Sequence, residues 1–252
     1  MMKKWFILCC LFSLQSEAAS ISTYRIYLDS EHRQQKFMVR NRSAIEEKCD
    51  ITFDYQAYLA GAEINVLSAE ERMALSEPAE KRFRYSPRQF TLAPKSTQYI
   101  AFSYKRQIND EPAEYRTYVN IKCLPQGIQG LVGINLSPTI VHSVPLVIRT
   151  GKAKDLNANL IYSQIKQREN GISFRLEHQG SRSIFGDFNL VDANGEKVEL
   201  LQKNVVLYPE MKYKDFSFNL SNATGENMKI VFQETGIESD KKRFSLPLEG
   251  EF

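Results

Sequence analysis

The sequence has few of the side chains that most catalytic and metal sites need. Its 252 residues include four cysteines and three histidines, and His32, His142 and His178 lie too far apart for a metal-ligand spacing. No G-x-S-x-G nucleophile motif is present. The glycines of residues 127–133, GIQGLVG, precede neither a Lys-Ser/Thr pair nor a helix, so they do not indicate a phosphate loop. We expect no enzymatic activity, no cofactor, no metal and no small-molecule substrate.

Long apolar runs and an excess of charge are also missing. No segment approaches the ~20 apolar residues that span a bilayer. Residues 1–18 have the pattern of a secretory signal, with Lys3 and Lys4 before an apolar core and a small-x-small site ending at Ala18. Removing them leaves 31 basic and 29 acidic residues, a balance too even to indicate nucleic-acid binding. We therefore expect a soluble, exported protein.

Cys49 and Cys123 are the cysteines that remain after signal cleavage. Cys49 shares its alternation with the apolar Ile51 and Phe53, and Cys123 shares its own with Ile121, so both thiols should face a core. An even number of cysteines in an oxidising compartment favours one disulfide. The alternative is a pair of buried, reduced cysteines.

Segments with alternating apolar residues, typical of β-strands, make up most of the first half. They cover residues 22–29, 35–41, 49–59, 88–93, 97–105, 115–124 and 133–149. Their number and spacing predict an immunoglobulin-like β-sandwich over residues 19–150. A helix is expected at residues 68–78, where Ser68 and Glu71 form a capping box and Pro78 ends the run.

The small, polar residues 150–159 predict a short hinge. A second series of strands follows at residues 160–167, 171–179, 183–192, 197–202, 204–208, 213–220, 227–233 and 243–249. We therefore expect an all-β protein of two immunoglobulin-like sandwich domains, residues 19–150 and 151–252, behind a signal peptide at residues 1–18.

Residues 133–149, GINLSPTIVHSVPLVIR, alternate for longer than an ordinary strand of roughly 5–6 residues. Either the strand bends between the two sheets of its own sandwich, or part of its apolar row is meant for another molecule. Pro138 lacks an N–H group, which an edge strand tolerates. The alternation alone does not decide between these readings.

Five motifs along the first domain, taken in order, resemble those of the periplasmic pilus (fimbrial) chaperones of the chaperone–usher pathway. They are YRIYLD (24–29), FMVRNRS (37–43), YSPRQFTLAPKSTQYIAF (85–102), AEYRTYVNIKCLP (113–125) and SVPLVIRTGK (143–152). The second domain matches only in architecture and size. The resemblance implies a periplasmic chaperone that binds a pilin-type subunit and delivers it to an outer-membrane usher, without enzymatic activity.

Members of this family lend a strand to a subunit whose own sandwich lacks one, which is a form of β-strand addition. The resemblance implies that Ile134, Leu136 and Ile140 enter the subunit. It also implies that the hinge end of the row packs in the chaperone's own core (Val144, Leu146 and Ile148). Free molecules could form a homodimer by capping one another's edge strands.

The family also binds the subunit's C-terminal carboxylate with two basic residues in the cleft between the domains. Arg25 matches the arginine of that pair, but Pro145 stands at the position of the lysine. EYR in the sixth strand resembles a divergent branch of the family that lacks this lysine. Here Arg116, or Arg149 four residues after Pro145, could supply the second charge. The alternatives are a solvated Arg25 and an interdomain ion pair of Arg116 or Arg149 with an acidic residue of the second domain.

Two other functions are compatible with the residues alone. An exported structural or adhesive β-sandwich protein would keep its long strand inside its own fold and have no chaperone role. A hydrolase would need a site that the motifs above do not reveal.

Overall fold

β-Strands make up nearly all of the regular secondary structure in the described chain. The computed structural model describes residues 19–58, 64–66, 68, 70–71, 79–108, 110–126, 139–152, 155–168, 171–220, 227–237 and 240–248. These residues form β-strands and short 3-10 helices at Ala79–Arg82 (η1) and Pro209–Met211 (η3). Among them, no helix is long and apolar enough to cross a membrane. The expected all-β fold is confirmed.

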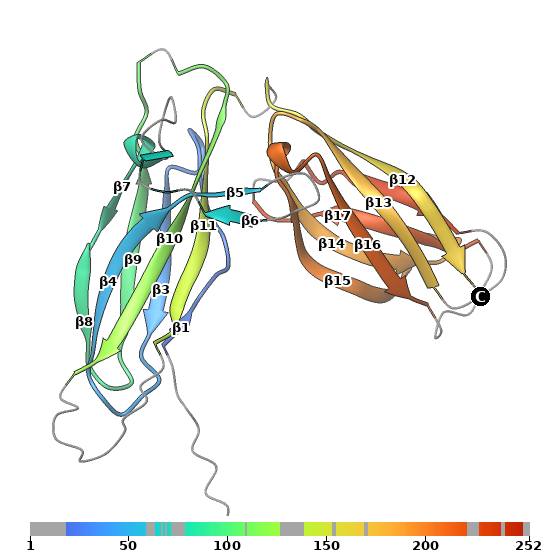
Figure 1. Cartoon of the computed structure of the whole chain (residues 1–252). Coiled ribbons are helices and arrows are strands. Elements are labelled where there is room, and N and C mark those ends of the chain that lie inside the picture. Colours follow the sequence, from blue (N-terminus) through green and yellow to red (C-terminus); the bar gives the residue numbers. More distant parts are fainter. Residues whose placement is uncertain are drawn as a thin grey trace, which may run out of the picture.

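The first half of the chain forms a sandwich of two sheets (Figure 1). Its strands are β1 (Ser20–Ile21), β2 (Ile26–Leu28), β3 (Gln34–Arg40), β4 (Glu47–Asp54), β7 (Phe83–Ser86), β8 (Gln89–Leu92), β9 (Thr97–Tyr104), β10 (Glu114–Pro125) and β11 (Val141–Arg149). One sheet has the order β1-β3-β9-β7 and the other the order β2-β11-β10-β4-β8. The pairing of β2 with β11 is parallel. The other pairs of this sheet, β11–β10, β10–β4 and β4–β8, are antiparallel.

The N-terminal segment is divided between these two sheets. In β1, Ile21 lies opposite Val39 of β3, whereas in β2 Ile26 lies opposite Leu146 of β11. The single strand expected at residues 22–29 is therefore wrong in extent, because residues 22–25 cross from one sheet to the other. The crossing leaves β2 only three residues long.

Two further differences from the expected strands lie in the first sandwich. The segment expected as one strand at residues 49–59 breaks at Tyr55 into β4 and β5 (Gln56–Tyr58), and β5 pairs with β6 (Ile64–Val66) in a separate hairpin. The sequence analysis did not predict β7, which pairs with β9.

The capping box of the expected helix is confirmed. The Ser68 N–H donates to Glu71 Oε2 over 2.8 Å, and the Glu71 N–H donates to Ser68 Oγ over 3.2 Å. The remainder of that helix, residues 72–78, lies outside the described residues.

The second half forms another sandwich, joined to the first between the end of β11 and the start of β12. Its strands are β12 (Ala158–Arg168), β13 (Gly171–Gly180), β14 (Ile184–Val191), β15 (Lys197–Leu207), β16 (Tyr213–Asn219), β17 (Lys229–Glu234) and β18 (Arg243–Pro247). The sheets have the orders β12-β13-β16 and β15-β14-β17-β18. The predicted domain boundary at residue 150/151 falls in this junction and stays a prediction.

β15 replaces two strands that the sequence analysis separated at Lys203. The pairing of β15 with β14 shifts register between Gly186 and Phe188. Asn204 has a φ of 57°, a left-handed conformation that asparagine tolerates better than most residues. Its N–H donates to Asp187 Oδ1 over 2.9 Å. The polar pair Lys203–Asn204 is therefore an irregularity within one strand instead of a turn.

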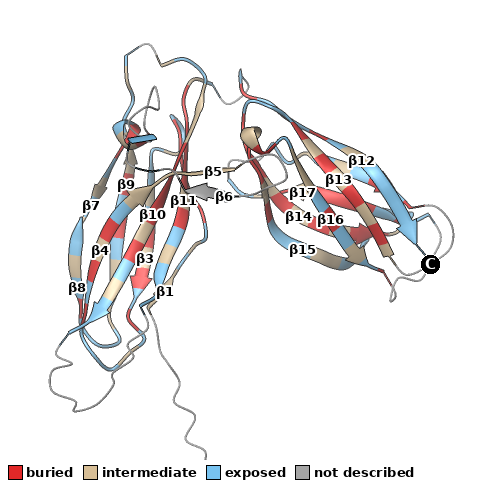
Figure 2. Cartoon of the chain, in the orientation of Figure 1, coloured by how far each residue is buried: buried red, intermediate tan, exposed pale blue. Residues whose placement is uncertain are grey.

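Each sandwich encloses its own group of buried apolar side chains (Figure 2). The first core includes Ile26, Phe37, Val119 and Leu146, and the second is rich in phenylalanine, with Phe188 at its centre against Phe174, Phe216 and Phe232. Since no residue belongs to both groups, the two sandwiches are joined by contacts of a different kind at the hinge.

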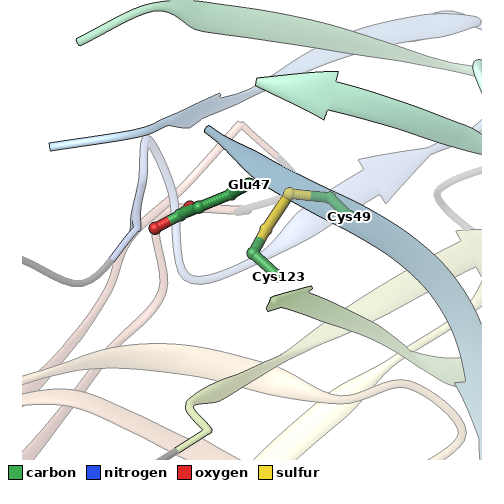
Figure 3. Close-up of side chains that lie close together, drawn as sticks. All are labelled: Glu47, Cys49 and Cys123. Atoms are coloured by element: carbon green, nitrogen blue, oxygen red, sulfur yellow. A yellow bond between two sulfur atoms is a disulfide. The ribbon is translucent and has the colours of Figure 1, made fainter. Parts of the chain in front are cut away.

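Cys49 and Cys123 form the disulfide that the sequence predicts. They lie opposite each other on β4 and β10, with Cα atoms 4.1 Å apart. Glu47 lies beside them (Figure 3), and its side chain is buried. These three side chains are close enough to hold a metal ion, but both sulfur atoms are already bonded to each other.

Burial raises the pKa of the Glu47 carboxyl, and a weaker hydrogen bond with Ser43 acts in the opposite direction. Because the folded-state pKa is raised above the unfolded value, the fold loses stability as the pH rises through that pKa. We predict that Glu47→Gln increases the free energy of unfolding at pH 7 and has no such effect below about pH 4, near the pKa of a free Glu. Urea unfolding at both pH values measures the difference.

Glu46→Gln is the matched control, since Glu46 is the exposed neighbour on the same strand connection. It should leave the unfolding free energy unchanged at both pH values. An equal effect of the two substitutions, or an effect of Glu47→Gln that persists at low pH, would contradict the role of burial.

Candidate partner-binding site at the hinge

One side of β11 is only partly covered by its neighbours. β10 pairs with β11 along its whole length, from Glu114 opposite Arg149 to Lys122 opposite Val141. On the other side β2 pairs only with residues 146–148. Within the described part of the chain, no strand pairs with residues 141–145 on that side. This portion of β11 is therefore a sheet edge that a further strand could join.

The apolar row that runs along β11 is buried at the hinge end of the strand and becomes exposed towards its N-terminal end. Val144, Leu146 and Ile148 are buried in the first core, which confirms the prediction for the hinge end of the row. Ile140 has the same alternation but is 49% exposed. Ile134 and Leu136, the other two predicted donor residues, lie outside the described residues.

Arg25 lies where the uncovered edge ends. Its neighbour Ile26 is opposite Leu146 in a parallel pairing, so Arg25 is level with Pro145. The Arg25 side chain is buried, its Nη2 donates to Ser183 Oγ over 2.8 Å, and its guanidinium carbon is 5.2 Å from the centre of the Phe185 ring. The alternative of a solvated strand-face arginine is therefore wrong.

A pocket of about 290 Å³ lies beside Arg25, and we call it the hinge pocket. Both sandwiches line it, the first with Thr23, Tyr24 and Arg25 and the second with Phe185, Asn204 and Ile237. None of the nine described residues that line it is acidic, and Arg25 is the charged one among them. A cation among uncharged side chains favours a ligand that carries a negative charge.

Arg116 holds the two sandwiches together. Its guanidinium forms an ion pair with Glu210 of η3, lies 3.5 Å from the centre of the Tyr208 ring, and donates to the Gln56 carbonyl over 2.9 Å. Burial lowers the pKa of Arg116, but the Tyr208 and Glu210 oxygens outweigh it, so the pKa is raised and the side chain stays charged. The interdomain ion pair considered for Arg116 is therefore present.

Arg149 reaches the second sandwich through a backbone contact. Its Nε donates to Glu114 Oε2 over 2.9 Å and its Nη2 donates to the Ser183 carbonyl over 3.0 Å. Glu114 Oε1 accepts the Ser183 N–H over 2.9 Å. Ser183 therefore contacts Arg25, Arg149 and Glu114 at once, at the point where the sandwiches meet.

The structure brings Arg25 and Arg149 together at Ser183 but engages Arg116 elsewhere, with Glu210. Their predicted role in binding a carboxylate stays a prediction. Four residues at the hinge are not predicted by any motif or alternation of the sequence: Glu114, Ser183, Tyr208 and Glu210. Glu114 lies opposite Arg149 in the β10–β11 register, so a correct pairing of these strands would have identified it. No local pattern identifies Ser183 or Glu210, because their partners lie far away in the sequence.

Comparison with known proteins gives a likeness of fold. No family model and no curated protein sequence matches the chain. The crystal structure of the class 5 fimbriae chaperone CfaA is similar over 92% of this chain and 100% of its own, with 14% identity and a TM-score of 0.51. A complex of the Salmonella enterica SafA pilin with the SafB chaperone matches over 92% and 96%, with 13% identity and a TM-score of 0.49. The likeness to CfaA shows the two-domain fold.

We predict that Arg116→Met lowers the free energy of unfolding by about 3 kcal/mol, because it removes one partner of a largely buried ion pair. That is the lower end of the range for such pairs, since the Glu210 side chain is one-third exposed and keeps contact with water. Urea unfolding measures the loss, and small-angle X-ray scattering should show a wider spread of angles between the sandwiches.

Arg175→Met is the matched control. Arg175 pairs with Asp215 over 2.8 Å at the surface of the second sandwich, where an ion pair contributes roughly 0–1 kcal/mol. Equal losses in the two variants would show that Arg116 does not join the sandwiches.

Proposed function

We propose that the protein is a periplasmic assembly chaperone that binds a pilin-type subunit by donating an edge of β11. One observation carries this proposal. No strand of the described residues covers the edge at residues 141–145, and the apolar row beside it continues past the protein's own core to the half-exposed Ile140. The two-domain fold shared with a fimbrial chaperone supports it.

Strand addition supplies the binding energy in two ways. Backbone hydrogen bonds join the guest strand to the uncovered edge, and alternate side chains enter the guest's core. Each fully buried aliphatic side chain contributes roughly 1.5–3 kcal/mol. Ile134, Leu136 and Ile140 would together contribute several kcal/mol, which a subunit without its last strand cannot obtain by itself.

Arg25 gives the guest strand a direction. A guest that runs parallel to β11 along the uncovered edge reaches Arg25 with its C-terminal carboxylate. An antiparallel guest would bring its positively charged N-terminus to the same guanidinium, which is unfavourable. We assign Arg25 as the carboxylate anchor, with Arg149 beside it through Ser183. Arg116 contributes to carboxylate binding indirectly, because its ion pair with Glu210 fixes the second sandwich relative to the first.

The remaining parts of the proposal concern the route of the subunit. A signal peptide at residues 1–18 directs the chain to the periplasm, where the disulfide forms. Delivery to an outer-membrane usher exchanges the donated edge for another subunit's strand, with no nucleotide and no enzymatic step. Before binding, two free molecules pair through their uncovered edges and so protect them.

We predict that Ile140→Asp abolishes co-purification of a pilin-type subunit with the tagged protein from periplasm, because a carboxylate cannot enter the guest's core. Val141→Asp is the control: Val141 has almost the same exposure, 48%, and the opposite alternation. It should leave the one-to-one complex intact. Circular dichroism and urea unfolding establish that both variants fold.

Other outcomes would favour the other functions. A structural or adhesive protein would bind no subunit, and Ile140→Asp would then unfold or aggregate the free chain. Equal loss of binding with Val141→Asp and Ile140→Asp would contradict strand donation. Hydrolytic activity that survives both substitutions would indicate an unrecognised hydrolase.

A further inference from the structure

The hinge pocket has an apolar side that a carboxylate anchor does not need. Tyr24 is 74% exposed and Ile237 is 60% exposed, and they line the pocket together with Phe185. Tyr24 comes from the first sandwich, whereas Phe185 and Ile237 come from the second. The pocket therefore combines a cation with apolar surface contributed from across the hinge.

We infer that the hinge pocket selects the last side chain of the bound subunit, and that it takes a C-terminal residue with an apolar side chain. This inference rests on the proposed function. The carboxylate lies at Arg25, and the side chain of the same residue lies against Tyr24, Phe185 and Ile237.

The volume of the pocket limits the occupant to about one residue. Pockets for drug-sized ligands measure about 300–1,000 Å³, and the hinge pocket, at about 290 Å³, lies at the lower end. A single terminal residue would fit if its carboxylate lies at Arg25, because Arg25 both lines the pocket and stands where the uncovered edge of β11 ends. The guest strand ends here because β2 occupies the next positions of that edge.

The charges around the pocket exclude other occupants. Among the described residues none that lines it is acidic, so a basic terminal side chain would find no partner among them. An acidic terminal side chain would bring a second negative charge to Arg25, beside apolar surface that does not solvate it. A leucine or phenylalanine side chain carries no charge that would be left unpaired or poorly solvated in the pocket. It would also cover the apolar surface of Tyr24 and Ile237.

The test uses the purified full-length mature protein and synthetic peptides, so it does not require the natural subunit. The probes are N-acetylated hexapeptides with the common body Thr-Thr-Val-Thr-Thr, which end in leucine or serine, each as the free acid or the amide. Chemical-shift titration gives the dissociation constants. We expect the leucine acid to bind roughly tenfold more tightly than the serine acid, from burial of one aliphatic side chain, and the leucine amide to bind more weakly than the leucine acid.

Ile237→Ser should reduce the difference between the leucine and serine acids to less than threefold and keep the difference between acid and amide. Val198→Ser is the control, because Val198 is 50% exposed on the same sandwich and does not line the pocket. It should change neither difference. Equal binding of the two acids to the unmodified protein, or no binding of any peptide, would overturn the inference.

The outcomes separate this inference from the proposed function. Capture of a pilin-type subunit whose last residue can be exchanged between leucine and serine without loss would overturn the pocket's role and leave strand donation in place. Discrimination among the peptides without capture of a subunit would contradict the chaperone function instead.

Discussion

The division of the N-terminal segment between two sheets determines the rest of the structure around the hinge. If residues 20–28 formed one strand beside β11, that strand would cover the edge along its length. Instead β1 joins β3, the chain crosses at residues 22–25, and β2 covers only residues 146–148. Among the described residues an edge next to an apolar row is left open, and Arg25 directly precedes Ile26, where the cover begins. The location of the candidate site and its positive charge thus have one topological cause.

Charged side chains fix the second sandwich against this edge. Buried ion pairs add little net stability over apolar packing, but separating the partners leaves an uncompensated buried charge, which favours the arrangement in which they meet. Glu114 and Arg149 both bond to the backbone of Ser183, and Arg116 lies between Glu210 and the Tyr208 ring. Phe185 follows Ser183 by two positions, so these contacts also place the Phe185 ring beside Arg25. The second sandwich therefore completes a pocket that the first sandwich cannot form alone.

The sequence predicts what alternation and local turns determine. The all-β fold, the Cys49–Cys123 disulfide, the Ser68–Glu71 capping box and the burial of the hinge end of β11 follow from side chains a few positions apart. The exchange of sheets at residues 22–25 does not, because Tyr24, Ile26 and Leu28 share one alternation, as they would in a single strand, although Tyr24 is exposed. The partners of Arg116 and Arg149 were missed for a similar reason: 94 positions separate Arg116 from Glu210, and 34 separate Arg149 from Ser183. Only the assembled hinge brings them together.

An open edge is also a liability, since any exposed strand can pair with it. Here the liability is restricted by local chemistry. Pro145 has no N–H group to donate, and His142 Nε2 donates to the Ala19 carbonyl over 2.7 Å, which ties the residue before β1 to the edge. Pairing through the backbone alone would accept many registers, because it does not depend on sequence. In the proposed function a charge at the end of the edge is different: only a guest whose C-terminal carboxylate coincides with Arg25 would gain both the hydrogen bonds and the ion pair, so the end of the guest would set its register.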